Sequence, residues 1–265
     1  RQGQYDSANA YAKRAVSIDS TFTLALRRIA LTLWWGEGGR GDFGPALVAE
    51  GRHNHGLSPR ESLLVTVDSM WGALGTDAQE LRPLFQKLSR TLGEALQRFP
   101  EDPEIWYHRG EMAYHFGALV TPQVTAQQAL DAFDRAIALD SAFGPPFQHS
   151  ADLALRLQGP EAARRYLSAF IALHPNEEAA SRLSHQLLDP DPARARAAQV
   201  SFDSLPRHVL IRALGTVAAW PDSGETAVLL ARALATARRG LTHRDSLVGP
   251  CALALALAAR GQCVL

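Results

Sequence analysis

Apolar and small residues recur along this chain with the period of a helix. From an anchor residue, similar residues follow 4 and 7 positions later, and a serine or proline follows 12 positions later. Offsets of 4 and 7 place side chains on one face of a helix, and the serine or proline marks its end. The four sets are Ala8, Ala12, Ala15, Ser20; Leu88, Leu92, Ala95, Pro100; Ala129, Phe133, Ala136, Ser141; and Ala163, Leu167, Phe170, Pro175.

These helices are spaced as in a repeat protein. A weaker fifth set runs Ala46, Glu50, His53, Ser58, so that successive anchors lie 34 to 42 residues apart. A period of this size predicts stacked helical units. A second pattern, Trp106, Gly110, Ala113 and Phe147, Ala151, Ala154, predicts a partner helix whose small residues permit close packing. No stretch alternates apolar and polar residues over a strand length, so we predict an all-α fold.

Signals for helix starts and breaks agree with this pattern. Capping boxes are expected at Ser58-Pro-Arg-Glu61 and Thr125-Ala-Gln-Gln128, and Asp102 is expected to cap the helix that carries Trp106. A glycine-rich loop is predicted over residues 36–57. Further helices are predicted over 206–220, 224–238 and 244–260, separated by Pro221-Asp-Ser-Gly224 and Gly240-Leu-Thr.

The repeat resembles the tetratricopeptide family. Its tryptophan, glycine, alanine and phenylalanine positions match Trp106, Gly110, Ala129, Phe133 and Ala136, with Tyr114 one place beyond the usual tyrosine. The resemblance implies a tetratricopeptide-like α-solenoid of antiparallel helix pairs over 1–175, followed by divergent helical repeats over 176–265. The segment at 3–8 is similar to a second helix without its first, and we expect the chain to stop inside a repeat near its C-terminus. We therefore expect a truncated array that self-associates through uncapped ends.

The chain is also similar to the repeat-rich C-terminal regions of bacterial serine/threonine kinases and winged-helix transcriptional activators. The matching segments are 57–64, 99–106 and 162–167. This implies a non-catalytic module that binds a protein or peptide, as the regulatory part of a larger bacterial signalling or transcription protein. The alternatives are a small-molecule-sensing module of a regulator, or a fragment of a kinase polypeptide without its catalytic domain.

In the tetratricopeptide family, the first helix of each pair lines a concave groove that binds the partner. Carried onto this sequence, the groove is aromatic and mildly acidic. Glu111 and Asp152 stand where the family's carboxylate clamp has asparagine, so recognition of a C-terminal carboxylate is not expected. The predicted groove residues are Arg27, Leu31, Trp34, Trp35, Tyr107, Glu111, Tyr114, His115, Gln148, Asp152 and Arg156.

Composition narrows the partners further. Twenty-seven basic residues balance 27 acidic ones, so no net field attracts nucleic acid. The longest apolar run, 251–259, has nine residues, half of what a membrane-spanning helix needs. The two cysteines, Cys251 and Cys263, indicate neither a disulfide framework nor a zinc site. A cytoplasmic protein with a peptide or protein ligand, no nucleic acid and no membrane segment is therefore expected.

Two kinase-like triplets do not predict an enzyme. Asp42-Phe43-Gly44 precedes His243-Arg244-Asp245, which reverses the order in kinases, and Pro250 stands where the catalytic asparagine belongs. His108, Glu111 and His115 share one helical face, but no further ligand cluster accompanies them. We accordingly predict no catalytic residues, no metal and no cofactor.

Overall fold

The computed structural model describes residues 5–35, 43–73, 81–120, 124–173, 179–218 and 224–236, together with Ala254 and Leu257. Within these residues the chain forms thirteen α-helices and one short 3₁₀ helix and no strand, so the predicted all-α fold is confirmed. The chain divides into two compact units, an N-terminal unit of residues 1–146 and a C-terminal unit of residues 147–265.

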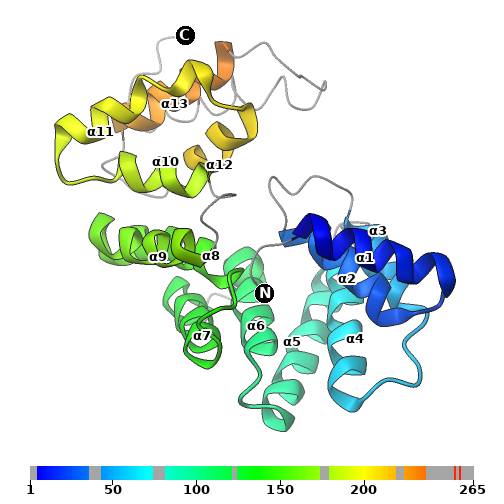
Figure 1. Cartoon of the computed structure of the whole chain (residues 1–265). Coiled ribbons are helices and arrows are strands. Elements are labelled where there is room, and N and C mark those ends of the chain that lie inside the picture. Colours follow the sequence, from blue (N-terminus) through cyan, green and yellow to red (C-terminus); the bar gives the residue numbers. More distant parts are fainter. Residues whose placement is uncertain are drawn as a thin grey trace. The chain divides into compact units, whose positions relative to one another are not determined.

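The described residues of the N-terminal unit form seven helices, and each packs against the next along the chain. They appear in chain order from blue to green in Figure 1. Contacts that skip one helix join α2, α4 and α6, because Arg27 of α2 and His108 of α6 both reach Asp68 of α4. The helices are α1 (Tyr5–Ile18), α2 (Thr23–Trp35), α3 (Phe43–Gly51), α4 (Pro59–Ala73), α5 (Leu81–Arg98), α6 (Pro103–Val120) and α7 (Ala126–Leu139).

The repeated apolar stripes form the core of these helices. Leu88, Leu92 and Ala95 of α5 are completely buried, and so are the three stripe residues of α7. The predicted helix starts are confirmed as well: Thr125 and Gln128 form a capping box. Asp102 Oδ1 accepts the backbone N–H groups of Glu104 and Ile105, which satisfies donors that have no partner inside the helix.

The predicted capping box at Ser58 is also formed. The backbone N–H of Ser58 donates to Glu61 Oε2 at 3.2 Å, and the backbone N–H of Glu61 donates to Ser58 Oγ at 3.3 Å. The reciprocal bonds fix the point where the chain enters α4. The position of this helix start is important because Arg60, the second residue of α4, lines the cavity described below.

Gly110 explains how closely α6 and α7 approach. A Cβ atom at this position would lie 2.5 Å from Cε1 of Phe133, which is inside the limit of any real carbon contact. The prediction that small residues of the Trp106 pattern permit close packing is therefore confirmed at this glycine. The two green helices lie side by side in Figure 1.

The predicted glycine-rich loop over 36–57 is wrong for Phe43–Gly51, which form α3. Leu47 of this helix is completely buried. Gly72 of α4 lets α3 and α4 approach closely, since a Cβ at Gly72 would lie 2.8 Å from Leu47 Cβ. Burial of apolar side chains thus outweighs the low helix propensity of the flanking glycines. Residues 36–42 lie outside the described part of the chain.

The C-terminal unit contains the remaining helices. Two of the predicted tail helices, 206–220 and 224–238, are confirmed over Arg207–Ala218 and Gly224–Thr236, and their predicted C-terminal ends lie outside the described residues. The third, 244–260, lies outside the described residues except for Ala254 and Leu257, which are helical. The helices are α8 (Pro146–Gln158), α9 (Pro160–Leu173), α10 (Ala179–Leu187), α11 (Pro192–Gln199), η2 (Phe202–Ser204), α12 (Arg207–Ala218) and α13 (Gly224–Thr236).

Two cores hold this unit together. α10, η2, α12 and α13 share a cluster of buried residues that includes Leu183, Phe202 and Leu230. The predicted stripe of α9 lies in a smaller cluster, where Ala163 and Leu167 pack against Ala151 and Leu155 of α8. The solenoid arrangement, the division at residue 175 and self-association through the ends remain predictions. No helix among the described residues is long and apolar enough to span a membrane.

The glycine contact gives a test of the packing. Gly110→Ala should lower the free energy of unfolding by roughly 1 to 3 kcal/mol, because the added methyl group overpacks the contact with Phe133. Gly93→Ala is the matched control: it lies inside α5 with no atom within 4 Å of the new Cβ, and should stabilise the helix by up to about 1 kcal/mol. Urea unfolding measures both, and equal effects of the two changes would contradict the close approach of α6 and α7.

Candidate functional site

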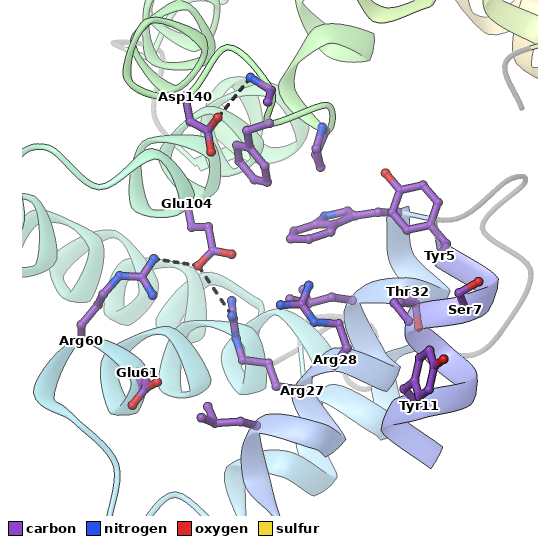
Figure 2. A pocket seen from close by; sticks show the side chains of 17 residues that line it. Tyr5, Ser7, Tyr11, Arg27, Arg28, Thr32, Arg60, Glu61, Glu104 and Asp140 are labelled. Carbon is purple, nitrogen blue, oxygen red and sulfur yellow. Dashed lines mark hydrogen bonds and ion pairs between the residues drawn. The ribbon is translucent and has the colours of Figure 1, made fainter. Parts of the chain in front are cut away.

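A cavity of about 810 Å³ opens in the N-terminal unit. Its walls come from α1, α2, the first turns of α4 and α6, and the loop after α7, as Figure 2 shows. Charged and aromatic side chains from segments far apart in sequence therefore face one space. The lining residues are Tyr5, Ser7, Ala8, Tyr11, Leu24, Arg27, Arg28, Leu31, Thr32, Trp35, Arg60, Glu61, Glu104, Asp140, Ala142, Phe143 and Pro145.

The floor of this cavity is held by a buried ion pair. Arg27 Nε donates to Asp68 Oδ2 at 2.6 Å, with Arg27 only 7% exposed and Asp68 completely buried. Burial alone would lower the pKa of Arg27, but the charges of Asp68 and Glu104 raise it above its ordinary value. Burial alone would raise the pKa of Asp68, but Arg27 and His108 lower it. Both groups of the pair therefore stay charged.

Glu104 carries this network up to the cavity wall. Its Oε2 accepts from Arg60 Nη2 at 2.8 Å and lies 3.6 Å from Arg27 Nη1. Arg60 Nε also donates to Asp102, the residue that caps α6. One carboxylate thus joins two arginines from different helices, and the dashed lines of Figure 2 follow both contacts. Because each charged group of this network is held by at least one neighbour, the side chains that form the floor have a fixed orientation.

Glu50 of α3 lies beside this network without joining it. The residue is completely buried, and neither carboxylate oxygen accepts a hydrogen bond from the described residues. Burial, and then the negative charge of Asp68, raise the pKa of Glu50 to about 9. Glu50 is therefore protonated at neutral pH.

Aromatic rings form the opposite wall of the cavity. Trp35 lies edge to face with Phe143 at 5.6 Å and with Tyr107 at 5.9 Å between ring centroids. The neighbouring Trp34 turns away from the cavity, since its ring packs 5.6 Å from that of Trp71 in the core. The two adjacent tryptophans thus have different surroundings, since Trp35 lines the cavity and Trp34 packs against the core.

The predicted groove residues of this unit are only partly brought together. Arg27, Leu31 and Trp35 line the cavity, whereas Trp34 and Tyr107 pack behind it. The prediction that Glu111 faces the groove is wrong, because Glu111 is 1% exposed and its Oε2 lies 3.5 Å from His115 Nε2. Reversing the charge of Glu111 would therefore lower the stability of the fold rather than change a binding surface. Tyr114 and His115 follow it on α6 and do not line the cavity.

The other three predicted residues lie on α8 of the C-terminal unit. Gln148 accepts a hydrogen bond from Arg212 Nη2, which ties α8 to α12. Asp152 Oδ2 lies 3.8 Å from His149 Nδ1, and Arg156 is exposed. A single groove that runs from Arg27 to Arg156 remains a prediction, since its members belong to two units.

Several lining residues were not predicted from sequence. The groove was expected on the first helices of pairs, so α1 and the loop over 140–145 were not considered, although they supply Tyr5, Tyr11 and Phe143. Arg28 was also missed, because it stands next to Arg27 in α2 and nothing in sequence separates a buried arginine from an exposed one. The capping signal at Asp102 located the start of α6, but only the structure shows that Arg60 contacts this residue.

Charged and aromatic groups dominate the chemistry of the cavity. Its lining offers guanidinium donors, carboxylate acceptors and aromatic faces. The histidine of the network, His108, is completely buried beneath them and contacts Asp68 at 3.1 Å, so it does not reach the cavity. In the C-terminal unit, Ser168 Oγ and His185 Nε2 are 3.0 Å apart and join α9 to α10.

Comparison with known proteins does not assign the chain to a family. No protein-family model matches it, and no curated protein matches it. The geometry of the cavity is therefore the main evidence for function.

Glu50 gives a pH-dependent test of the network. Its folded pKa is raised above the unfolded value, so folding takes up a proton and stability falls as pH rises from about 4.5 toward 9. Glu50→Gln removes this loss and should raise the free energy of unfolding at pH 8 by up to a few kcal/mol, with little change at pH 4.5. Urea unfolding at the two pH values checks this, with the exposed Glu94→Gln of α5 as control. A parallel pH dependence in wild type and Glu50→Gln would contradict a protonated Glu50.

Proposed function

We propose that this protein is a non-catalytic binding module whose N-terminal unit holds a peptide segment of another protein in the cavity between α1, α2, α4, α6 and the loop over 140–145. The observation that carries the proposal is the combination of a fixed charged floor and an aromatic wall in a cavity of about 810 Å³. Aromatic residues and arginine are the side chains most enriched where proteins bind one another.

The floor is preorganised for binding. Arg27 and Glu104 keep their orientation through Asp68 and Arg60, so a ligand does not have to order them. Binding sites that are ordered before the ligand arrives lose less conformational entropy on association. The aromatic wall at Trp35 and Phe143 adds apolar area with few rotatable bonds. These features support a peptide ligand with both polar groups and an apolar side chain.

A second candidate function is the sensing of a small molecule. The volume of the cavity lies within the range of about 300 to 1,000 Å³ that is typical of small-molecule sites. In either case the similarity to regulatory regions of bacterial kinases and activators supports a role as the sensory part of a larger signalling or transcription protein. The alternative of a kinase fragment without its catalytic domain remains compatible with that role.

Blocking the cavity tests the proposal. The wild-type chain is mixed with a synthetic pool of N-acetylated, C-amidated random decapeptides, and the retained peptides are sequenced by mass spectrometry. Ala142→Trp should lower the affinity of a retained peptide at least tenfold, because an indole at this exposed lining position fills the cavity. The bond from the backbone N–H of residue 142 to Asp140 is kept, so folding should be unaffected.

The matched control is Ala138→Trp, an exposed position of α7 outside the lining. It should bind the same peptides as wild type does. Retention of no peptide by the wild-type chain, or equal affinities for the two tryptophan variants, would rule out peptide binding in this cavity. A metabolite pool that raises the melting temperature of wild type but not of Ala142→Trp would favour the small-molecule function.

A further inference from the structure

The charged groups of the cavity differ in how far their own neighbours satisfy them. Glu104 accepts from two arginines, Asp140 Oδ1 accepts the backbone N–H of Ala142 at 3.0 Å, and Glu61 accepts from Ser58. All three lining carboxylates therefore have intramolecular donors. These donors occupy acceptor positions of the carboxylates that a ligand cation would otherwise use.

Among the lining arginines, Arg28 is the exception. Arg27 and Arg60 are paired with Asp68, Asp102 and Glu104, but no hydrogen bond or ion pair among the described residues engages the guanidinium of Arg28. Figure 2 shows that the side chain of Arg28 points into the same cavity as Arg27 and Glu104. Its five N–H donors are therefore open to a ligand.

Free donors also remain on the two paired arginines. Nη2 of Arg27 is buried without a hydrogen-bond acceptor in the described residues, and Arg27 as a whole is 7% exposed. Buried donors without a partner are unfavourable and favour a ligand that supplies an acceptor. The guanidinium of Arg28 and Nη2 of Arg27 are thus lining donors with no acceptor among the described residues, and they fit an acceptor-rich, negatively charged group.

From these contacts we infer that the cavity binds a peptide through an internal aspartate or glutamate side chain, held by Arg28, beside an apolar residue that packs on Trp35 and Phe143. A planar guanidinium matches a carboxylate with two parallel hydrogen bonds. A doubly charged phosphate fits less well, because Glu61, Glu104 and Asp140 line the same cavity as this one unpaired arginine. This inference rests on the proposed function and specifies its ligand.

Reversal of the charge at Arg28 tests the inference. Peptides retained from the blocked decapeptide pool by the wild-type chain should be enriched in aspartate or glutamate at one position. Against such a peptide, Arg28→Glu should weaken binding roughly tenfold or more. Replacing the acidic residue of the peptide by lysine should then restore binding to Arg28→Glu while it abolishes binding to wild type. Arg28 is exposed and unpaired, so this change should leave the fold intact.

The control is Arg90→Glu, which makes the same charge change at an exposed position of α5 outside the cavity. It should bind the acidic peptide as wild type does. Some retained peptides could lose affinity for Ala142→Trp and yet show no acidic position, or bind Arg28→Glu as well as wild type. Either result would overturn the inference and leave the proposed function standing. Retention of no peptide would remove the proposed function itself.

Discussion

The charged pair of Arg27 and Asp68 is the interaction on which the N-terminal unit depends. Neither group is accessible to water to any useful extent, and a buried charge without a partner costs several kcal/mol. The pair forces α2 and α4 into one arrangement, and the contact of Asp68 with His108 extends that constraint to α6. Apolar packing of the repeated stripes supplies the driving force for folding, but it is tolerant of small shifts. The buried charges are not, because their hydrogen bonds require one geometry.

The cavity follows from this constraint. Arg27 has Asp68 beneath it and Glu104 beside it, so its side chain forms a floor that a ligand meets already in place. Glu104 is fixed from the other side by Arg60, and Asp102 ties Arg60 to the cap of α6. A neutral Glu50 avoids a further negative charge next to Asp68. The ion pairs fix the charges of Arg27, Arg60 and Glu104. Arg28 is the lining arginine whose guanidinium has no partner among the described residues.

Periodicity predicted the fold better than it predicted the site. The stripes of α5, α7 and α9, the caps at Ser58, Asp102 and Thr125, and the all-α class depend on contacts near in sequence, which a single sequence reveals. The cavity depends on side chains up to more than a hundred residues apart, such as Tyr5 and Phe143. The resemblance to tetratricopeptide repeats named Arg27, Leu31 and Trp35, which line the cavity. The sequence could not show that Glu111 is buried or that Phe43–Gly51 is helical. Those outcomes are set by tertiary packing, which overrides local propensity.

The most direct test is peptide binding to the double variant Arg27→Met, Asp68→Asn. It removes both buried charges while an amide remains to bond His108, so the chain should stay folded, as replaced buried ion pairs often allow. If the pair fixes the floor, a peptide selected by the wild-type chain should bind the folded double variant at least about tenfold more weakly. Unchanged affinity in a folded double variant would show that the buried pair does not organise the cavity, and would contradict this account.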